Sequence, residues 1–284
     1  MVDLALEQIS VFGLPPVQFV ELAADLGCRH ITTSLRPSGA YNPHGYAKYC
    51  LKEDKTLRRE MIAAMRDRGI TPSLADGIAI LQNVDARSTY SADLDLLREL
   101  GVARINVVSL DPDLHRTFDQ LGVIVEMAAN VGIATVVEFV PIFTIADLAT
   151  AVTAVRHVGR KDCSVLFDTM HFGRSGAPIG DIAALDPKLI GYIQLCDAKL
   201  VPVIPNYLEE AMYERMVPGE GELSLGEMLA ALPRDLIVGL EVPMRREAEA
   251  GVGPRERMRR CVAATQTLLA QLPPVALQGV STAN

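Results

Sequence analysis

The sequence predicts a single (β/α)8 barrel, and three observations favour that fold. Apolar, strand-like runs alternate with helix-like segments eight times, and no linker or change of composition interrupts them. No glycine-rich phosphate-binding motif follows the first expected strand, which disfavours an open, doubly wound sheet. Polar side chains end four different strands, and a closed barrel brings strand ends together at one mouth. The expected barrel spans residues 1–272, and the polar tail 273–284 is expected to fray.

The first half of the chain supplies four strand–helix units. Pro15 and Pro16 open the first helix, and a glycine follows each helical segment as a stop signal. The expected strands are 9–14, 30–35, 71–75 and 104–110. The expected helices are 17–26, 56–68, 92–100 and 114–131. A polar loop, 36–55, is long enough to be a lid or a binding loop.

The second half of the chain repeats the pattern with more polar strand ends. The expected strands are 135–141, 165–168, 190–197 and 236–243. The expected helices are 145–158, 179–185, 225–231 and 255–271, with Thr144 as the N-cap of the first. Between residues 197 and 222 the sequence gives no clear element.

Composition excludes several classes of protein. The chain has 284 residues, 49% of them hydrophobic, and a net charge of −8, which argues against nucleic acid as a partner. No uncharged apolar run reaches about 18 residues, so no membrane span is expected. The N-terminus does not resemble a signal peptide. The 5 cysteines are scattered without a C-x-x-C pair, which indicates reduced thiols in a cytoplasmic protein.

Four oxygen-bearing side chains lie at matching places on the last four expected strands: Glu138, Asp168, Gln194 and Glu241. A charged group at the end of a buried strand avoids the core and points into the barrel mouth. Three carboxylates so close together would repel one another unless a cation neutralised them. Since all four donors are oxygens, the sequence predicts one divalent ion, Mn²⁺ or Mg²⁺ in preference to Zn²⁺. The alternative is that each group is paired separately with a backbone N–H or an arginine.

Five further side chains are candidate substrate contacts. His171 lies three residues after Asp168, and Arg174 and Arg215 carry the guanidinium groups that clamp oxyanions. Lys199 and His44 complete the set, although Lys199 could instead pair locally with Asp197. For both arginines a surface ion pair, and for His171 a structural role, are the alternatives.

The order of these motifs resembles the sugar-phosphate isomerase/epimerase superfamily, whose members have a xylose isomerase-like barrel of the AP endonuclease family 2 type. The motifs are EFVP, FDTMHFGRSG, IQLCDA, RMVPGEG and GLEVP, all within residues 135–243. The resemblance implies that Glu138, Asp168, Gln194 and Glu241 are metal ligands and that Glu138 and Glu241 are the acid/base pair. It also implies that His171 and Arg215 contact the substrate. Many relatives carry His where this chain has Gln194.

The resemblance implies an enzyme of carbohydrate metabolism. A divalent ion bound to a carbonyl and a neighbouring hydroxyl acidifies the carbon between them, and a glutamate removes its proton to leave an enediolate. Return of the proton gives isomerisation or epimerisation of a small keto-sugar or hydroxy-ketone. Loss of a β-hydroxyl instead makes the protein a lyase that dehydrates a cyclic keto-polyol such as 3-dehydroshikimate or inosose. Both alternatives stay open.

Two other functions are disfavoured. A nuclease of the same superfamily needs additional metal-binding histidines, and the chain has 5 His and an acidic charge balance. A binding subunit without activity would not need the intact acid set. The expected partner is therefore a small molecule, with neither nucleic acid nor membrane, and a homo-oligomer is compatible with the fold.

Overall fold

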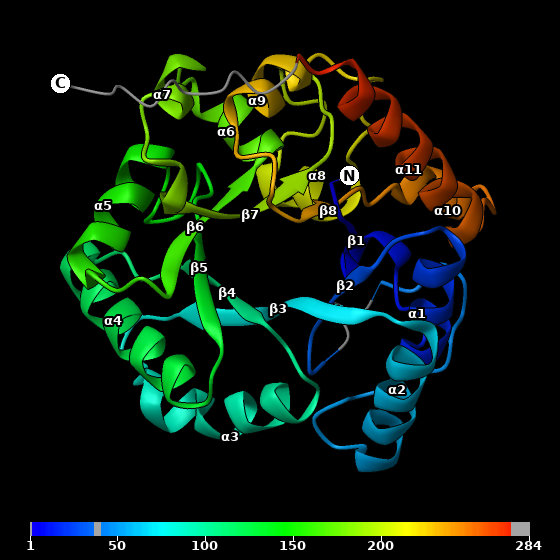
Figure 1. Cartoon of the computed structure of the whole chain (residues 1–284), viewed down its shortest axis with the longest axis horizontal. Helices are drawn as coiled ribbons and strands as arrows, with labels where there is room; N and C mark the ends of the chain where they lie inside the picture. The colour runs from blue at the N-terminus through cyan, green and yellow to red at the C-terminus, as the bar shows by residue number, and fades with distance from the viewer. Residues whose placement is uncertain (1, 37–40, 274–284) are drawn as a thin grey trace, which may run out of the picture.

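The computed structural model describes residues 2–36 and 41–273, which form a closed barrel of eight parallel strands (Figure 1). Each strand pairs with the next in sequence, and β8 (Val238–Leu240) pairs with β1 (Leu4–Leu6) to close the ring. The other strands are β2 (His30–Thr33), β3 (Thr71–Ile80), β4 (Arg104–Ser109), β5 (Ala134–Glu138), β6 (Cys163–Asp168) and β7 (Ile190–Leu195). The predicted fold class is confirmed.

In the part of the chain that the structure describes, seven helices surround the strands as an outer ring (Figure 1). They are α1 (Pro16–Asp25), α2 (Lys55–Arg68), α3 (Ala86–Glu99), α4 (Leu114–Asn130), α5 (Leu148–Val158), α9 (Leu225–Ala231) and α11 (Pro254–Gln271). Further helices of at most 7 residues lie in the connections: η1 (Gln8–Val11), α6 (Thr169–Ser175), α7 (Gly180–Ala183), η2 (Pro187–Leu189), α8 (Tyr207–Tyr213) and α10 (Arg245–Glu249). Within the described ranges, no helix has the length and apolar character needed to cross a bilayer.

The barrel interior changes from apolar to polar along its axis. The apolar layer is a separate cluster of buried residues: Ala5, Leu74, Val136, Leu166 and Tyr192. Because side chains two residues apart on a strand point to the same face, the next inward-facing residues are polar on every one of these strands. These are Glu7, Asp76, Glu138, Asp168 and Gln194. An apolar floor therefore supports a polar mouth at the carboxyl ends of the strands.

The expected first strand, 9–14, is wrong. The strand is Leu4–Leu6, and a 3-10 helix, Gln8–Val11, occupies the first half of the expected range. Phe12 and Gly13, which follow that helix, both have left-handed backbone conformations (φ of 47° and 81°). Ser10 is buried in this turn, where its hydroxyl donates to the Leu240 carbonyl at 3.0 Å. Three residues are too few to show the alternation by which a strand is recognised, so the apolar residues that follow were a misleading signal.

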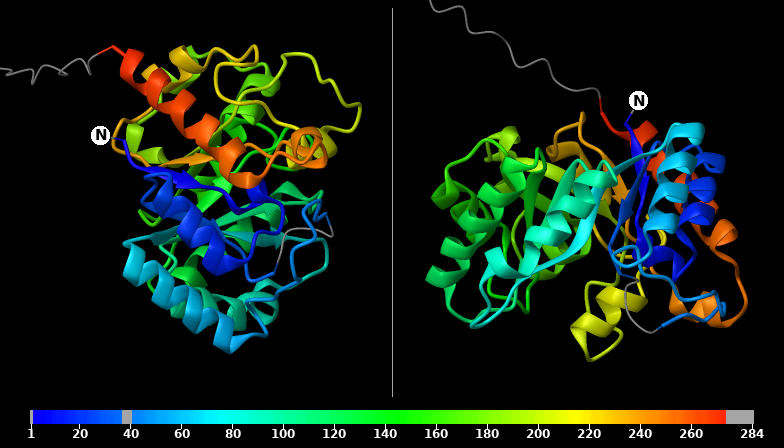
Figure 2. Two further views of the ribbon diagram at one scale, coloured as in Figure 1. Left: turned by 90° about the vertical axis from the view of Figure 1, so that its right-hand side faces the viewer. Right: turned by 90° about the horizontal axis from the view of Figure 1, so that it is seen from below.

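Several other boundaries differ from expectation. Strand β3 continues to Ile80, with an irregular register between Ala75 and Ile78. Asp147, not Thr144, is the N-cap of α5, and its side chain accepts from the Thr150 N–H at 2.8 Å. Helix α8 lies in the segment where no element was expected, and it projects beyond the barrel on the side away from the N-terminus (Figure 2, right). Parts of two expected segments, 37–40 and 274–284, lie outside the described residues.

Candidate active site at the barrel mouth

The four predicted metal ligands lie together at the carboxyl ends of neighbouring strands. Glu138 and Asp168 are the last residues of β5 and β6, Gln194 pairs in register with Asp168, and Glu241 directly follows β8. Asp168 and Gln194 are 0% exposed, and Glu138 and Glu241 are each 8% exposed. The site is therefore enclosed.

A buried arginine lies between two of the carboxylates. Nη1 of Arg215 is 2.5 Å from Oδ2 of Asp168 and 2.8 Å from Oε2 of Glu241. Burial disfavours the charged form of Asp168, but the charges of Arg215 and His171 and the His171 N–H outweigh it and lower its pKa to about 2. Burial raises the pKa of Glu241 well above its usual value, and nearby Asp168 and Glu138 add to the rise against the opposing charge of Arg215. Two neighbouring carboxyls thus have opposite proton preferences.

His171 faces Glu138 and Asp168 from the first turn of α6. Its Nε2 is 3.2 Å from Oε1 of Glu138, and its Nδ1 is 2.6 Å from the hydroxyl of Tyr207. Asp168 caps α6 by accepting the His171 N–H at 2.8 Å, which fixes the imidazole relative to the strand end. Ligand atoms of Glu138, Asp168 and His171 all lie within 4.8 Å of one another. These residues can hold one divalent ion, and the geometry adds His171 to its possible ligands.

Gln194 indicates that the mouth is built for a ligand. Its side chain is 0% exposed, and neither Nε2 nor Oε1 has a hydrogen-bond partner among the described residues. Burial of an unpaired amide costs free energy that a partner would recover. Carboxylate and amide oxygens are suitable donors for a hard divalent cation. The residues present therefore fit a bound metal ion.

Sequence reasoning missed the polar residues on the other side of the mouth. Asn106, on β4, donates to Oε2 of Glu138 at 2.6 Å and to Oδ1 of Asp76 at 3.3 Å. Burial, and then the charge of Glu138, raise the pKa of Asp76 to about 7. Glu7, directly after β1, is 0% exposed. An amide inside the apolar run of β4 was the signal for Asn106, whereas the misplaced first strand concealed Glu7.

Three predicted substrate contacts have protein partners of their own. Arg174 is buried against Glu210, with Nη2 and Oε1 3.0 Å apart. Lys199 pairs with Glu222 at 3.1 Å, and His44 lies 3.2 Å from a guanidinium nitrogen of Arg257. The substrate-binding roles of Arg174, Lys199 and His44 stay predictions.

The expected ion pair between Asp197 and Lys199 is wrong. Asp197 is buried and accepts backbone N–H groups from Gly219 at 2.9 Å and Leu223 at 3.1 Å. A Cβ at Gly221 would lie 2.2 Å from Oδ1 of Asp197, so the turn needs glycine there to approach the carboxylate. Asp197 therefore holds the PGEGE turn against the barrel.

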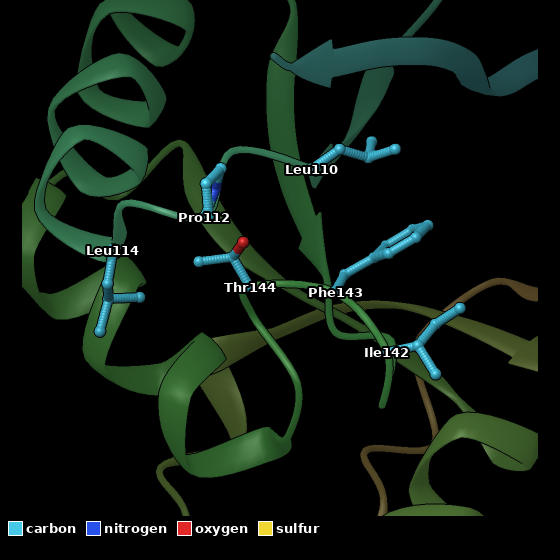
Figure 3. A pocket seen from close by; sticks show the side chains of 6 residues that line it. All are labelled: Leu110, Pro112, Leu114, Ile142, Phe143 and Thr144. Atoms are coloured by element: carbon cyan, nitrogen blue, oxygen red, sulfur yellow. The ribbon is translucent and has the colours of Figure 1, made fainter. Parts of the chain in front are cut away.

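An apolar hollow lies beside the mouth but does not contain the carboxylates (Figure 3). The loops after β4 and β5 line it with Leu110, Pro112, Leu114, Ile142, Phe143 and Thr144. None of these side chains titrates, and the one hydroxyl among them, of Thr144, donates to the Asp111 carbonyl. The chemically equipped site is the enclosed mouth.

The chain is similar in sequence to a known protein family and to two curated relatives. The family described as "Xylose isomerase-like TIM barrel" matches residues 20–261. Two curated relatives are named inosose isomerase: one from Bacillus velezensis is 25% identical over 183 residues, and one from Halalkalibacterium halodurans is 29% identical over 109 residues. The matches span 59% and 38% of this chain, and only 64% and 37% of the relatives' length.

A solved structure extends the likeness in fold to nearly the whole chain. The IolI protein, whose crystal structure is described as having a binding zinc atom, superposes with a TM-score of 0.79 at 18% sequence identity. The match covers 96% of this chain and 99% of that protein. Because the family match covers most of its length, this chain belongs to the xylose isomerase-like TIM barrel family.

Proposed function

We propose that the protein is a divalent-metal-dependent isomerase or epimerase of a small, uncharged keto-sugar or hydroxy-ketone. One observation carries the proposal: Glu138 and Glu241 lie on strands at either side of Asp168 and Gln194, within one enclosed mouth. Two carboxyls that flank a common binding position are the arrangement that proton removal and proton return require. The inosose isomerases among the relatives are consistent with this class of reaction.

The ion would be held by Glu138, Asp168, Gln194 and Glu241, with His171 adjacent. Because these four ligands all offer oxygen, the set favours Mn²⁺ or Mg²⁺. When bound, the ion supplies the positive charge that acidifies a carbon next to a carbonyl. One glutamate takes the proton from that carbon, and the other is placed to return a proton. Asn106 and His171 fix both oxygens of Glu138, so this carboxylate is held ready in one orientation.

The charges of the mouth favour an uncharged substrate. Arg215 already contacts Asp168 and Glu241, and Arg174 is paired with Glu210. These two buried arginines are therefore committed to protein carboxylates, while Asp76 and Glu138 add further acidic groups. A phosphate or carboxylate on the substrate would meet repulsion here. Hydroxyl groups can pair with carboxylates and amides without that penalty.

The proposal is tested by solvent-deuterium exchange. Mg²⁺-loaded protein is incubated in D₂O with ketohexoses, inosose and 3-dehydroshikimate, and the recovered compounds are analysed by NMR. We expect deuterium at a carbon next to the carbonyl of a neutral ketone, and only with metal present. Glu138→Gln and Glu241→Gln should abolish this exchange, whereas Asp119→Asn, at an exposed position on α4, should not change it.

Three outcomes would contradict the proposal. Exchange within about tenfold of wild type in either glutamine variant, roughly 1.4 kcal/mol in the barrier, would remove that glutamate from the reaction. Dehydration of 3-dehydroshikimate without exchange of neutral ketones would make the protein a lyase. Absence of both exchange and metal binding would refute the enzymatic proposal itself.

A further inference from the structure

Glu7 is a carboxyl on the floor of the mouth that the proposed chemistry leaves without a role. It is 0% exposed, and the hydroxyl of Tyr192 donates to its Oε1 at 3.1 Å. Its other oxygen, Oε2, has no hydrogen-bond partner among the described residues. A buried carboxyl with a free oxygen is costly, and such groups commonly have a specific task.

The barrel makes room for this carboxyl. A Cβ at Gly239 would lie 1.8 Å from Oε1 of Glu7 and 2.9 Å from the hydroxyl of Tyr192. Gly239 is not among the glycines with positive φ, so space and not backbone conformation requires glycine at this position. The hydroxyl of Tyr192 is in turn 3.3 Å from that of Ser73. Glu7 therefore occupies a place formed for it between the apolar floor and the mouth.

The carboxyl of Glu7 lies close to the unpartnered amide of Gln194, because Gln194 pairs in register with Gly239 and a Cβ at Gly239 would lie 1.8 Å from Oε1 of Glu7. Burial, followed by the charge of Asp76, raises the pKa of Glu7, and hydrogen bonding from Thr32, Tyr192 and Gln194 opposes the rise. In the structure itself, Nε2 of Gln194 has no hydrogen bond of good distance and angle among the described residues. Two buried groups, one with a free acceptor and the other with a free donor, thus lie next to each other.

We propose that Glu7 is a positioning residue: it accepts a hydrogen bond from Nε2 of Gln194 and so directs Oε1 of that amide toward the metal ion. This inference rests on the proposed function, because it requires the metal site. An amide presents a donor at one end and an acceptor at the other, and only the oxygen can ligate a hard cation. A partner that holds the NH₂ group selects the productive orientation, as partners of metal ligands commonly do.

The experiment measures Mn²⁺ affinity, which does not depend on turnover. Dissociation constants are obtained by titration calorimetry, and by the EPR signal of free Mn²⁺, for wild type, Glu7→Met and Glu7→Gln. Methionine fills a similar volume without an acceptor oxygen, whereas glutamine keeps one. We expect Glu7→Met to weaken Mn²⁺ binding by about 10- to 100-fold, the range found when partners of metal ligands are removed. Glu7→Gln should retain part of that affinity, and since both variants lose the charge, their difference isolates the acceptor.

The same measurement in a Gln194→Ala protein separates a positioning role of Glu7 from an effect of its charge. In Gln194→Ala there is no amide to orient, so adding Glu7→Met should change the Mn²⁺ dissociation constant less than threefold. An equal loss in both backgrounds would assign the effect of Glu7 to charge or packing and overturn the proposal. Glu7→Leu replaces Glu7→Met if the latter does not fold, as judged by circular dichroism.

The failures of the two proposals are distinguishable. If wild type binds Mn²⁺ at one site and Glu7→Met binds it as tightly, the positioning role is wrong while the metal site stands. If wild type binds no divalent ion, the proposed function and the role of Glu7 fall together.

Discussion

Substitutions in the buried ion pair between Arg174 and Glu210 test whether this arginine stabilises the fold or contacts the substrate. The two side chains are 4% and 2% exposed, and Nη2 of Arg174 is 3.0 Å from Oε1 of Glu210. Nε of Arg174 also donates to the Lys199 carbonyl at 2.8 Å. The pair thus joins α6 to the segment that carries α8, whose Tyr207 contacts His171. We expect Arg174→Met and Glu210→Gln to act mainly on stability.

The burial of both side chains sets the size of the expected loss of stability. Removal of one partner from a buried pair leaves an uncompensated charge and costs about 3–5 kcal/mol. With an unfolding entropy of about 2.1 cal/mol/K per residue and 284 residues, the melting temperature should fall by roughly 5 to 8 °C. Replacing both partners, as in Arg174→Met/Glu210→Met, removes both charges and should cost less than the two single changes added together.

The assay is urea unfolding combined with steady-state kinetics. The control pair is Arg260 and Glu247, whose closest contact is 2.8 Å but whose side chains are each 32% exposed. Arg260→Met should cost no more than about 1 kcal/mol, because solvent screens a partly exposed pair. The reasoning is refuted if Arg174→Met unfolds like wild type while its KM rises, since Arg174 would then be a substrate contact, the role for which its guanidinium group made it a candidate.

Three further predictions concern the metal, the cysteines and a helix cap. Chelation should lower the melting temperature, and Mn²⁺ at about 100 times its dissociation constant should add about 2.7 kcal/mol of stability; a melting temperature unaffected by Mn²⁺ would contradict the site. Burial raises the pKa of four thiols to about 12, those of Cys28, Cys163, Cys196 and Cys261. Thiol titration at pH 8 should therefore label only Cys50 before unfolding and all five cysteines afterwards. Asp147→Ala should destabilise the protein by about 1 kcal/mol because α5 loses its N-cap, whereas Asp119→Ala, at a 73% exposed side chain, should stay within 0.5 kcal/mol by urea unfolding.

The second half of the barrel could be predicted from sequence because its strands carry strong, local signals. Each consists of a continuous apolar run that ends in one oxygen-bearing side chain, and parallel strands place such ends on one side of the sheet. A strand that ends at Asp168 and a helix over 225–231 were expected, and the structure gives Cys163–Asp168 and Leu225–Ala231. Where local pattern and tertiary burial agree, the sequence suffices.

Other features of the site could not be predicted because they depend on tertiary contacts. Glu7 was hidden because a three-residue strand has no recognisable period. Asp76 lies where β3 changes register, so an acid at the expected end of the strand is instead in its middle. The pairing of Arg174 with Glu210 joins residues 36 positions apart, and no local pattern encodes such a contact. These features arise from closure of the barrel and not from any one segment.

Arg215 neutralises only part of the negative charge at the mouth. The acids that contact Arg215 can therefore also bind a metal ion. Asp168 presents two oxygens: Oδ2 contacts Arg215, whereas Oδ1 accepts the His171 N–H at 2.8 Å and lies 4.0 Å from its ring. A carboxylate can satisfy different partners with its two oxygens, so Asp168 need not release Arg215 in order to contact an ion on its other side. Arg215 keeps this acid ionised and in place, which burial alone would not allow. The remaining negative charge, on Glu138 and its neighbours, is what a divalent ion would neutralise.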